Sequence, residues 1–209
     1  MLRVGDCPGS GLINRVGIAD LRLFSGSTAV HSDMVIWSQT DSVESAASQL
    51  ISILFGVPQI SVRHDQLSEE HREMLKNWLD FWLRYREVLL HGDFRPLFPQ
   101  NNYPLVEGEK DGVVVSVVTA PMSVPYPSHK IAEQVIVNGT KQDCLVVVFP
   151  AAGAYRLTVF DAAGRCLPRG FAGCPEVLEV EAGPRLLPVP VSGRLHLADG
   201  LRTPRPPDG

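Results

Sequence analysis

A polar triplet interrupts an apolar stretch of the sequence, and its side chains are of types that could line a functional site. The stretch TAVHSDMVIW covers residues 28–37 and sets His31, Ser32 and Asp33 among β-branched and aromatic residues. Such a run, bounded by Gly and polar residues, is typical of a β-strand. Two interpretations stay open. Either the strand ends at the triplet and its C-terminal tip lines a site, or the three groups are capped or paired locally and do no chemistry.

Two further reactive groups lie near the start of the chain, at Asp6 and Cys7. Taken alone, Asp6 is typical of an exposed loop carboxylate, because Pro8 follows it closely and favours a turn. Cys7 offers a thiol nucleophile, but the sequence places no histidine to activate it, so we discount thiol chemistry.

The composition limits the classes of protein to consider. The chain has 209 residues, a net charge of −4, 44% hydrophobic residues and 20% charged residues, which is an ordinary globular balance. It has no basic run, so we expect no nucleic-acid partner. With no apolar stretch of about 18 residues and no signal-peptide core, we expect no membrane span and a cytoplasmic protein. The four cysteines lack metal-ligand spacing, so we expect reduced thiols, no metal and no cofactor.

The first part of the chain alternates short apolar runs with helical patterns. Asp41, with Glu44 three residues on, resembles a capping box, and Ser68 is placed to cap a long helix. Repeated strand–helix units imply parallel strands joined by crossover helices. Three strands alone make a poor parallel sheet, so we expect the chain to begin in the middle of a larger fold. The expected strands lie at 2–4, 28–37 and 59–63, and the expected helices at 12–23, 43–54 and 69–91.

From residue 92 onward the pattern is all-β. Short β-rich runs are separated by Gly, Asn, Asp and Pro, which indicates an antiparallel sandwich or barrel. The tail at 201–209 is Pro-rich and charged, so we expect it to be disordered. The expected strands are at 113–119, 134–137, 145–149, 155–160, 177–180 and 195–197.

Several segments of the chain also carry a resemblance to a known family. They are RVGDCPGSGLINRV, LRLFSGSTAVHSDMVIW, SVESAASQLISILFGVPQISVR, WLDFWLRYREVLLHGDFRPLFP and NYPLVEGEKDG. In this order they resemble the C-terminal part of melibiase-type α-galactosidases, a family of retaining glycoside hydrolases, from about residue 2 to residue 199. That family has a TIM barrel followed by an antiparallel β-sandwich. The resemblance implies that residues 1–91 hold the last three βα units of the (β/α)8 barrel and residues 92–200 the sandwich.

The resemblance also implies roles for the polar residues noted above. Asp6 matches the position of the acid/base that follows the sixth barrel strand, and we expect burial beside a pocket wall to raise its pKa. His31, Ser32 and Asp33 would fall at or near the tip of the seventh strand and face the sugar. Trp37 would follow in the next loop. These four residues are the candidate substrate-binding residues.

The sequence departs from the family pattern in two ways. Retaining glycosidases need two carboxylates roughly 5–5.5 Å apart, and no segment here matches the strand that carries the nucleophile. Gly9, Ser10 and Gly11 stand where the family usually has a further acidic residue. We therefore expect an α-galactosidase-like hydrolase acting on α-galactoside oligosaccharides, truncated at its N-terminus and inactive alone. A homo-oligomer or a complementing N-terminal fragment is the expected protein partner.

Two other interpretations remain. The second part could be a non-catalytic sugar-binding or subunit-interaction module, which would need an aromatic platform built from Phe149, Tyr155, Phe160 and Phe171. Residues in strands are more often core. The first part could instead be a small open α/β sheet, but no Gly-rich loop follows its first strand, so nucleotide binding has little support.

Overall fold

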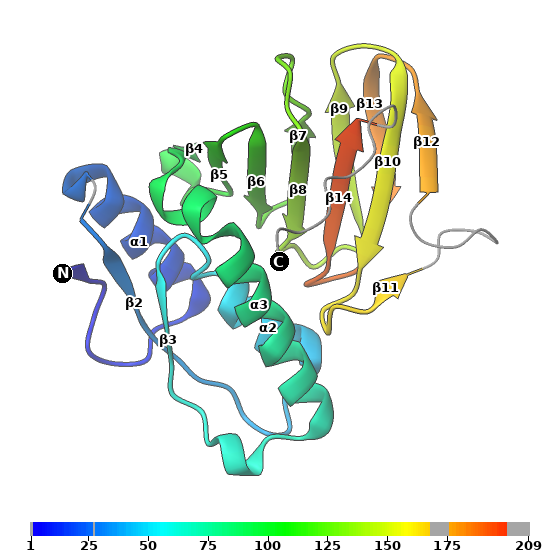
Figure 1. Cartoon of the computed structure of the whole chain (residues 1–209). Helices are drawn as coiled ribbons and strands as arrows, with labels where there is room; N and C mark the ends of the chain where they lie inside the picture. The colour runs from blue at the N-terminus through cyan, green and yellow to red at the C-terminus, as the bar shows by residue number, and fades with distance from the viewer. Residues whose placement is uncertain (1, 27, 168–175, 200–209) are drawn as a thin grey trace.

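The computed structural model describes residues 2–26, 28–167 and 176–199. The predicted disordered tail at 201–209 and the candidate platform residue Phe171 therefore lie outside the described residues. Figure 1 shows a small parallel sheet with its helices beside a larger β region. No helix within these ranges is long and apolar enough to cross a lipid bilayer.

The N-terminal part consists of parallel βα units, as predicted. The three strands pair in the order β1-β2-β3 and all are parallel. They form an open sheet and not a closed barrel, so the barrel itself is not present within the described residues. The elements are β1 (Leu2–Arg3), α1 (Gly11–Ser25), β2 (Val30–Val35), α2 (Val43–Ile51), β3 (Val57–Ile60), the 3-10 turn η1 (His64–Gln66) and α3 (Glu69–His91).

The predicted N-cap residue is right at α3 and wrong by one residue at α2. Ser68 caps α3 through its side chain, as expected. Ser42, and not Asp41, caps α2, because the Ser42 hydroxyl accepts a hydrogen bond from the Ser45 N–H at 3.2 Å. The Asp41 carboxylate is used elsewhere, since it accepts from the Ser38 N–H at 2.8 Å and closes the turn before the helix.

The second part is built from two packed β layers. An eight-stranded sheet has the order β11-β10-β14-β8-β6-β5-β4, with β12 beside β10, and a three-stranded sheet has the order β13-β9-β7. Pairing is antiparallel except between β6 and β8 and between β7 and β9. The strands are β4 (Asp93–Leu97), β5 (Leu105–Lys110), β6 (Val113–Val118), β7 (Ser123–Pro125), β8 (Glu133–Asn138), β9 (Cys144–Phe149), β10 (Gly153–Phe160), β11 (Cys166–Leu167), β12 (Glu176–Val180), β13 (Gly183–Pro188) and β14 (Arg194–Asp199), with a 3-10 turn η2 (Pro99–Asn101) after β4. The six predicted strands are confirmed, and five more were not predicted.

The large sheet separates two hydrophobic cores. On β6, Val114 and Val118 belong to the core between the two sheets, together with Phe149. Val115 and Val117 belong to the other core, which lies on the face that α3 covers. Alternate residues of a strand point to opposite faces, so both faces of this sheet are apolar and both are covered.

Helix α3 joins the two parts of the chain. It contacts α2 as well as strands β4, β5 and β6 of the large sheet. Trp78 is 1% exposed and its ring N–H donates to the Ala162 carbonyl at 3.0 Å. A Cβ at Gly108 would lie 2.8 Å from the Val88 carbonyl, so only glycine at this position of β5 allows the helix to come so close. Trp78 and the close approach at Gly108 therefore hold α3 against the sheet.

Arg22 of α1 fixes that helix to the end of α3. Its guanidinium donates to the Leu89 carbonyl at 2.5 Å, the Leu90 carbonyl at 3.1 Å and the Phe55 carbonyl at 3.0 Å. It also lies 3.9 Å from the centre of the Phe94 ring. A cation is favourable at the last carbonyls of a helix, and burial lowers the pKa of Arg22 to about 10.

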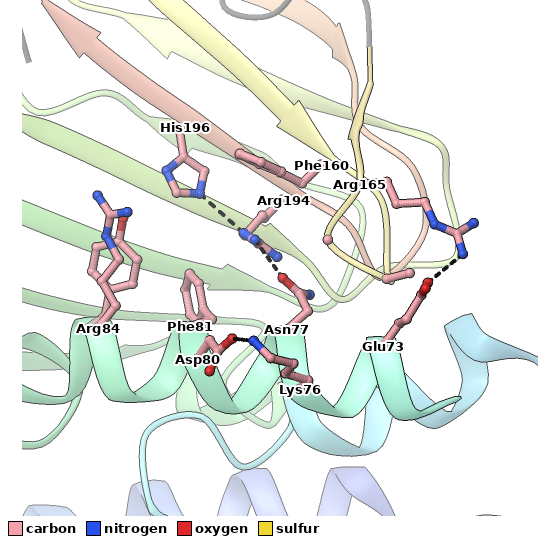
Figure 2. Close-up of a pocket in the computed structure, with 13 residues that line it drawn as sticks. Glu73, Lys76, Asn77, Asp80, Phe81, Arg84, Phe160, Arg165, Arg194 and His196 are labelled. Carbon is pink, nitrogen blue, oxygen red and sulfur yellow. Dashed lines mark hydrogen bonds and ion pairs between the residues drawn. The ribbon is translucent and has the colours of Figure 1, made fainter. Parts of the chain in front are cut away.

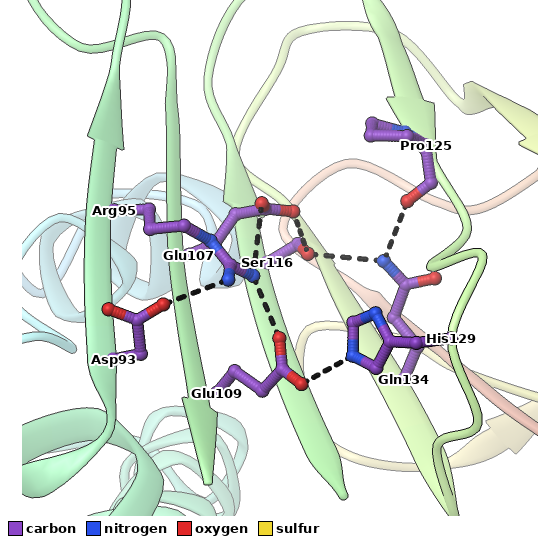
Figure 3. A network of polar contacts seen from close by, with 8 residues as sticks. All are labelled: Asp93, Arg95, Glu107, Glu109, Ser116, Pro125, His129 and Gln134. Atoms are coloured by element: carbon purple, nitrogen blue, oxygen red, sulfur yellow. Dashed lines mark hydrogen bonds and ion pairs between the residues drawn. The ribbon is translucent and has the colours of Figure 1, made fainter.

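A network of polar side chains links β4, β5, β6 and β8 to one another (Figure 3). Arg95 lies 3.1 Å from a Glu109 carboxylate oxygen and 3.7 Å from one of Glu107. The Ser116 hydroxyl donates to Glu107 at 2.8 Å and accepts from Gln134 at 3.3 Å. Burial raises the pKa of Glu107. Because each member bonds to a neighbouring strand, we interpret the network as structural.

The cysteine prediction is wrong at one position. Cys7 and Cys144 are free, but Cys166 is disulfide-bonded. The spacing of cysteines along a sequence does not determine which of them meet in space.

Candidate functional site

Four of the five predicted site residues, Asp6, His31, Ser32 and Asp33, lie where β1 ends against β2. Arg3, the last residue of β1, pairs with His31. Strand β2 continues to Val35, so the triplet lies within the strand, and the interpretation in which the strand ends at the triplet does not hold. The pairing with β1 nevertheless ends at His31. Ser32 and Asp33 therefore lie just beyond the C-terminal end of β1.

A shift in strand pairing shapes the triplet. Between His31 and Met34 the register of β2 against β3 is broken. The buried Ser32 hydroxyl accepts a hydrogen bond from the Gln59 N–H at 2.9 Å and so replaces a missing backbone bond. For Ser32, the interpretation of local pairing is correct. β-Bulges re-aim neighbouring side chains and are frequent beside active sites.

The carboxylate of Asp33 is buried but not isolated. The Asp33 N–H donates to the Asn14 side-chain oxygen at 2.8 Å, and one carboxylate oxygen accepts from the Met34 N–H at 2.8 Å. The same oxygen lies 3.8 Å from the guanidinium of Arg3. Helix α1 and strand β1 together therefore fix the position of this carboxylate.

Asp6 reaches the same guanidinium from the loop after β1. One of its carboxylate oxygens lies 3.1 Å from an Arg3 nitrogen, while its side chain is 91% exposed. The predicted burial of Asp6 is wrong in this structure, because the loop carries the side chain away from the sheet into solvent. An ion pair this exposed contributes about 1 kcal/mol or less. Arg3 nonetheless brings the Asp6 and Asp33 carboxylates to one place.

Two buried donors beside Asp33 have no partner among the described residues. They are the Nε of Arg3 and the Nδ2 of Asn14. An unpaired buried N–H is costly, so an acceptor that reached these groups would be bound favourably. With Asp33 as acceptor, these donors make a set of groups suited to binding hydroxyls.

The remaining predicted residues are less closely associated. His31 is half-buried, with its Nδ1 3.5 Å from the Gln59 amide nitrogen, the upper limit of a hydrogen bond. Trp37 packs against the core and its ring centre lies 6.5 Å from that of His71 on α3. Within the described ranges, no hydrogen bond or ring contact joins Trp37 to Asp33. Nor do these ranges contain a group of three or more His, Cys, Asp or Glu side chains arranged to hold a metal.

A cavity of about 550 Å³ lies elsewhere, between α3, the turn after β10 and strand β14. Figure 2 shows charged side chains from both sides pointing toward it. This cavity was not predicted from the sequence, although the alternation of polar and apolar residues in RLHLAD (194–199) indicates which side chains face it. Leu195 and Leu197 face the inner core, so Arg194 and His196 must face α3.

Arg194 is the most buried charged group of the cavity, with 8% of the residue exposed. It donates to the Asn77 side-chain oxygen at 2.9 Å and to Nε2 of His196 at 3.3 Å. Its guanidinium carbon lies 4.6 Å from the centre of the Phe160 ring. Burial lowers the pKa of Arg194 to about 10.

His196 is held as a neutral ring. Burial lowers its pKa, and its Nε2 accepts from Arg194, so its proton is assigned to Nδ1. That nitrogen lies 2.8 Å from a Glu133 carboxylate oxygen, which also accepts from the Tyr85 hydroxyl at 3.1 Å. Glu133 thus pairs with His196 and Tyr85, and it forms no ion pair with Arg194.

No family model matches this chain, and no curated protein matches it. The resemblance to melibiase-type enzymes therefore rests on the sequence segments alone.

Proposed function

We propose that this chain is the C-terminal part of an α-galactosidase-like retaining glycoside hydrolase, which removes terminal α-galactosides from oligosaccharides. The strand order supports the proposal. In a TIM barrel, strands consecutive in sequence are neighbours and all are parallel, as β1, β2 and β3 are here. The mostly antiparallel sheets that follow correspond to the family's β-sandwich. On this proposal, residues 1–91 belong to the barrel and residues 92–200 to the sandwich.

One observation carries the proposal for the site. Asp6 and Asp33 meet the guanidinium of Arg3 at the C-terminal end of β1. TIM-barrel enzymes build their sites at the C-terminal ends of the strands. A carboxylate at this end, beside buried donors, suits an enzyme that protonates a glycosidic oxygen and binds sugar hydroxyls.

In this proposal Asp6 is the general acid and base. It protonates the leaving oxygen in the first step and accepts a proton from water in the second. To do so it must hold a proton near neutrality, which requires burial that its exposed position here does not supply. The bound sugar and the rest of the barrel would supply it. Asp33, His31 and Ser32 would position the sugar, Ser32 by holding the bulge.

The alternative binding module has less support. Phe149 is 1% exposed and Tyr155 packs against the inner core. The third described candidate, Phe160, lines the cavity between α3 and β14. It lies there beside cationic side chains and does not form an open aromatic platform.

One assay tests the proposal. It places the coding sequence upstream of residue 1 in frame with this chain and measures hydrolysis of an aryl α-galactoside in a host without its own α-galactosidase. We expect turnover by the extended protein and none by the chain alone, because a retaining mechanism needs a second carboxylate. An extended protein with no glycosidase activity would contradict the proposal.

A further inference from the structure

The cavity between α3 and β14 is lined by two arginines, Arg84 and Arg194, that form no ion pair among the described residues. We propose that it is a binding site for a small organic anion, one that carries a carboxylate or a phosphate group, with the guanidinium groups of Arg194 and Arg84 as its anchors. The inference is independent of the proposed hydrolase function, because the residues that line the cavity include none of those at the β1–β2 site.

Arg194 has an unused donor in this cavity. Its Nη1 is buried and has no hydrogen-bond partner among the described residues. Its other nitrogens bond to neutral acceptors, Asn77 and His196. A buried guanidinium is ordinarily paired with a carboxylate. Here no such ion pair exists within the described ranges, and Asp161 acts on the guanidinium only electrostatically. The guanidinium of Arg194 can therefore donate a hydrogen bond to an external oxyanion.

Arg84 supplies a second positive charge at the same cavity. Its guanidinium lies 5.3 Å from the centre of the Tyr85 ring, and among the described residues it forms no ion pair. The other cations are already neutralised. Lys76 pairs with Asp80 at 2.5 Å, and Arg165 pairs with Glu73 at 2.7 Å, as Figure 2 shows. The residues that line the cavity therefore carry two more positive than negative charges. The carboxylates of Glu133, bonded to His196 and Tyr85, and of Asp161 offset part of this surplus.

The walls of the cavity favour an organic anion over a bare ion. Phe160 and Phe81 lie 4.6 and 5.3 Å from the Arg194 guanidinium. They exclude water on one side of the cation, which strengthens its attraction for an anion. A volume of about 550 Å³ is within the range of small-molecule sites.

The turn after β10 closes one side of this cavity. Gly164 in that turn has a φ of +85°, and a Cβ there would lie 2.1 Å from the Asn77 side-chain oxygen. The ion pair of Arg165 with Glu73 ties the turn to α3. Asn77 is therefore held between the turn and Arg194, and the guanidinium is positioned before any ligand binds.

The test is titration calorimetry on the full chain with three probes: inorganic phosphate, glucuronate and galactose. We expect saturable binding of phosphate or glucuronate and no binding of neutral galactose. Whichever of the two anions binds more tightly identifies the oxyanion. Arg84→Gln changes a surface arginine and is expected to fold normally. It should weaken anion binding by about tenfold or more, the loss expected for one charge-assisted contact.

Arg194→Gln removes the buried anchor and should weaken binding at least as much. Circular dichroism and a melting curve establish whether this variant folds, and if it does not, the Arg84→Gln result decides. The matched control is Arg86→Gln, two residues along α3, whose side chain is 59% exposed and does not line the cavity. Anion binding that is absent, or that Arg84→Gln leaves equal to that of Arg86→Gln, would overturn the proposal. Tighter binding of galactose than of either anion would overturn it as well.

Discussion

The side-chain oxygen of Asn14 accepts a hydrogen bond from the backbone N–H of Asp33 at 2.8 Å. This bond links the helix that follows β1 to the bulge of β2. Asn14 is fully buried, so the bond is shielded from water and strongly directional. The helix thereby fixes the position of the one buried carboxylate at the candidate site.

Replacing Asn14 should loosen this position. Asn14→Ala leaves the buried Asp33 N–H without a partner, which costs about 1–3 kcal/mol of unfolding free energy. Urea denaturation followed by circular dichroism measures the loss. Asn101→Ala, at an exposed position of η2, is the control and should change stability by less than about 0.5 kcal/mol. Equal effects of the two changes would show that the Asn14 bond does not stabilise the bulge.

Trp78 should be one of the most sensitive positions for stability. It is 1% exposed and bonded to the Ala162 carbonyl across the interface of α3 with the sheet. Trp78→Ala should cost about 3–5 kcal/mol, through lost burial and a cavity. Leu83→Ala on the same helix, where Leu83 is 56% exposed, should cost little. A small effect of Trp78→Ala would mean that α3 does not depend on this contact with the sheet.

Amide hydrogen exchange should distinguish the two parts of the chain. We expect faster exchange in residues 2–65 than in residues 110–198, because the parallel sheet has three strands and α1 carries apolar side chains in solvent. Leu12, Ile13 and Leu23 are each more than 45% exposed, and Phe24 is 90% exposed. Uniform protection along the chain would show that the first part is as stable as the second.

Stability should fall as the pH is lowered from 7.5 to 5.5. Burial lowers the pKa of His196 below its ordinary value of 6.5. The unfolded chain therefore binds a proton below about pH 6.5 that the folded protein does not, and this favours unfolding. The folded protein regains this proton at its own lower pKa, where the loss levels off.

His196→Gln should make this pH dependence shallower, as measured by urea denaturation at several pH values. His64→Gln, at an exposed position of η1, is the control for loss of a histidine elsewhere. If His196→Gln and wild type show the same slope between pH 7.5 and 5.5, His196 is not held neutral by its burial.

The sequence predicts much of the fold and little of the site. Periodicity and caps locate the helices, because these signals are local. Strands β4 and β13 were not predicted, because they contain Pro96, Pro184 and Pro188, and proline is disfavoured within a sheet. Both strands lie at sheet edges, and proline is tolerated there. Strand β5 was not predicted, because it contains Gly108 and glycine is uncommon within strands. The structure explains this glycine by the close packing of α3.

The site depended on contacts that no local pattern specifies. The bond from Asp33 to Asn14 and the ion pair of Arg3 with Asp33 join residues from different elements. A pattern could place Asp33 on a strand, but the bulge that aims it arises from the pairing of β2 with β3. By contrast, the orientation of the Arg194 side chain toward α3 follows from the alternation of polar and apolar residues in its own strand.

If Asp6 is the acid/base of a retaining glycosidase, its replacement should affect substrates differently according to their leaving groups, and a kinetic comparison measures this difference. It compares Asp6→Asn with wild type in the extended protein, on a natural α-galactoside and on an activated aryl α-galactoside, with and without azide. We expect a loss of roughly 10²–10⁴-fold on the natural substrate, which needs the proton, and a smaller loss on the aryl substrate. Azide needs no general base and should restore the second step. Near wild-type activity of Asp6→Asn on the natural oligosaccharide would contradict the claim.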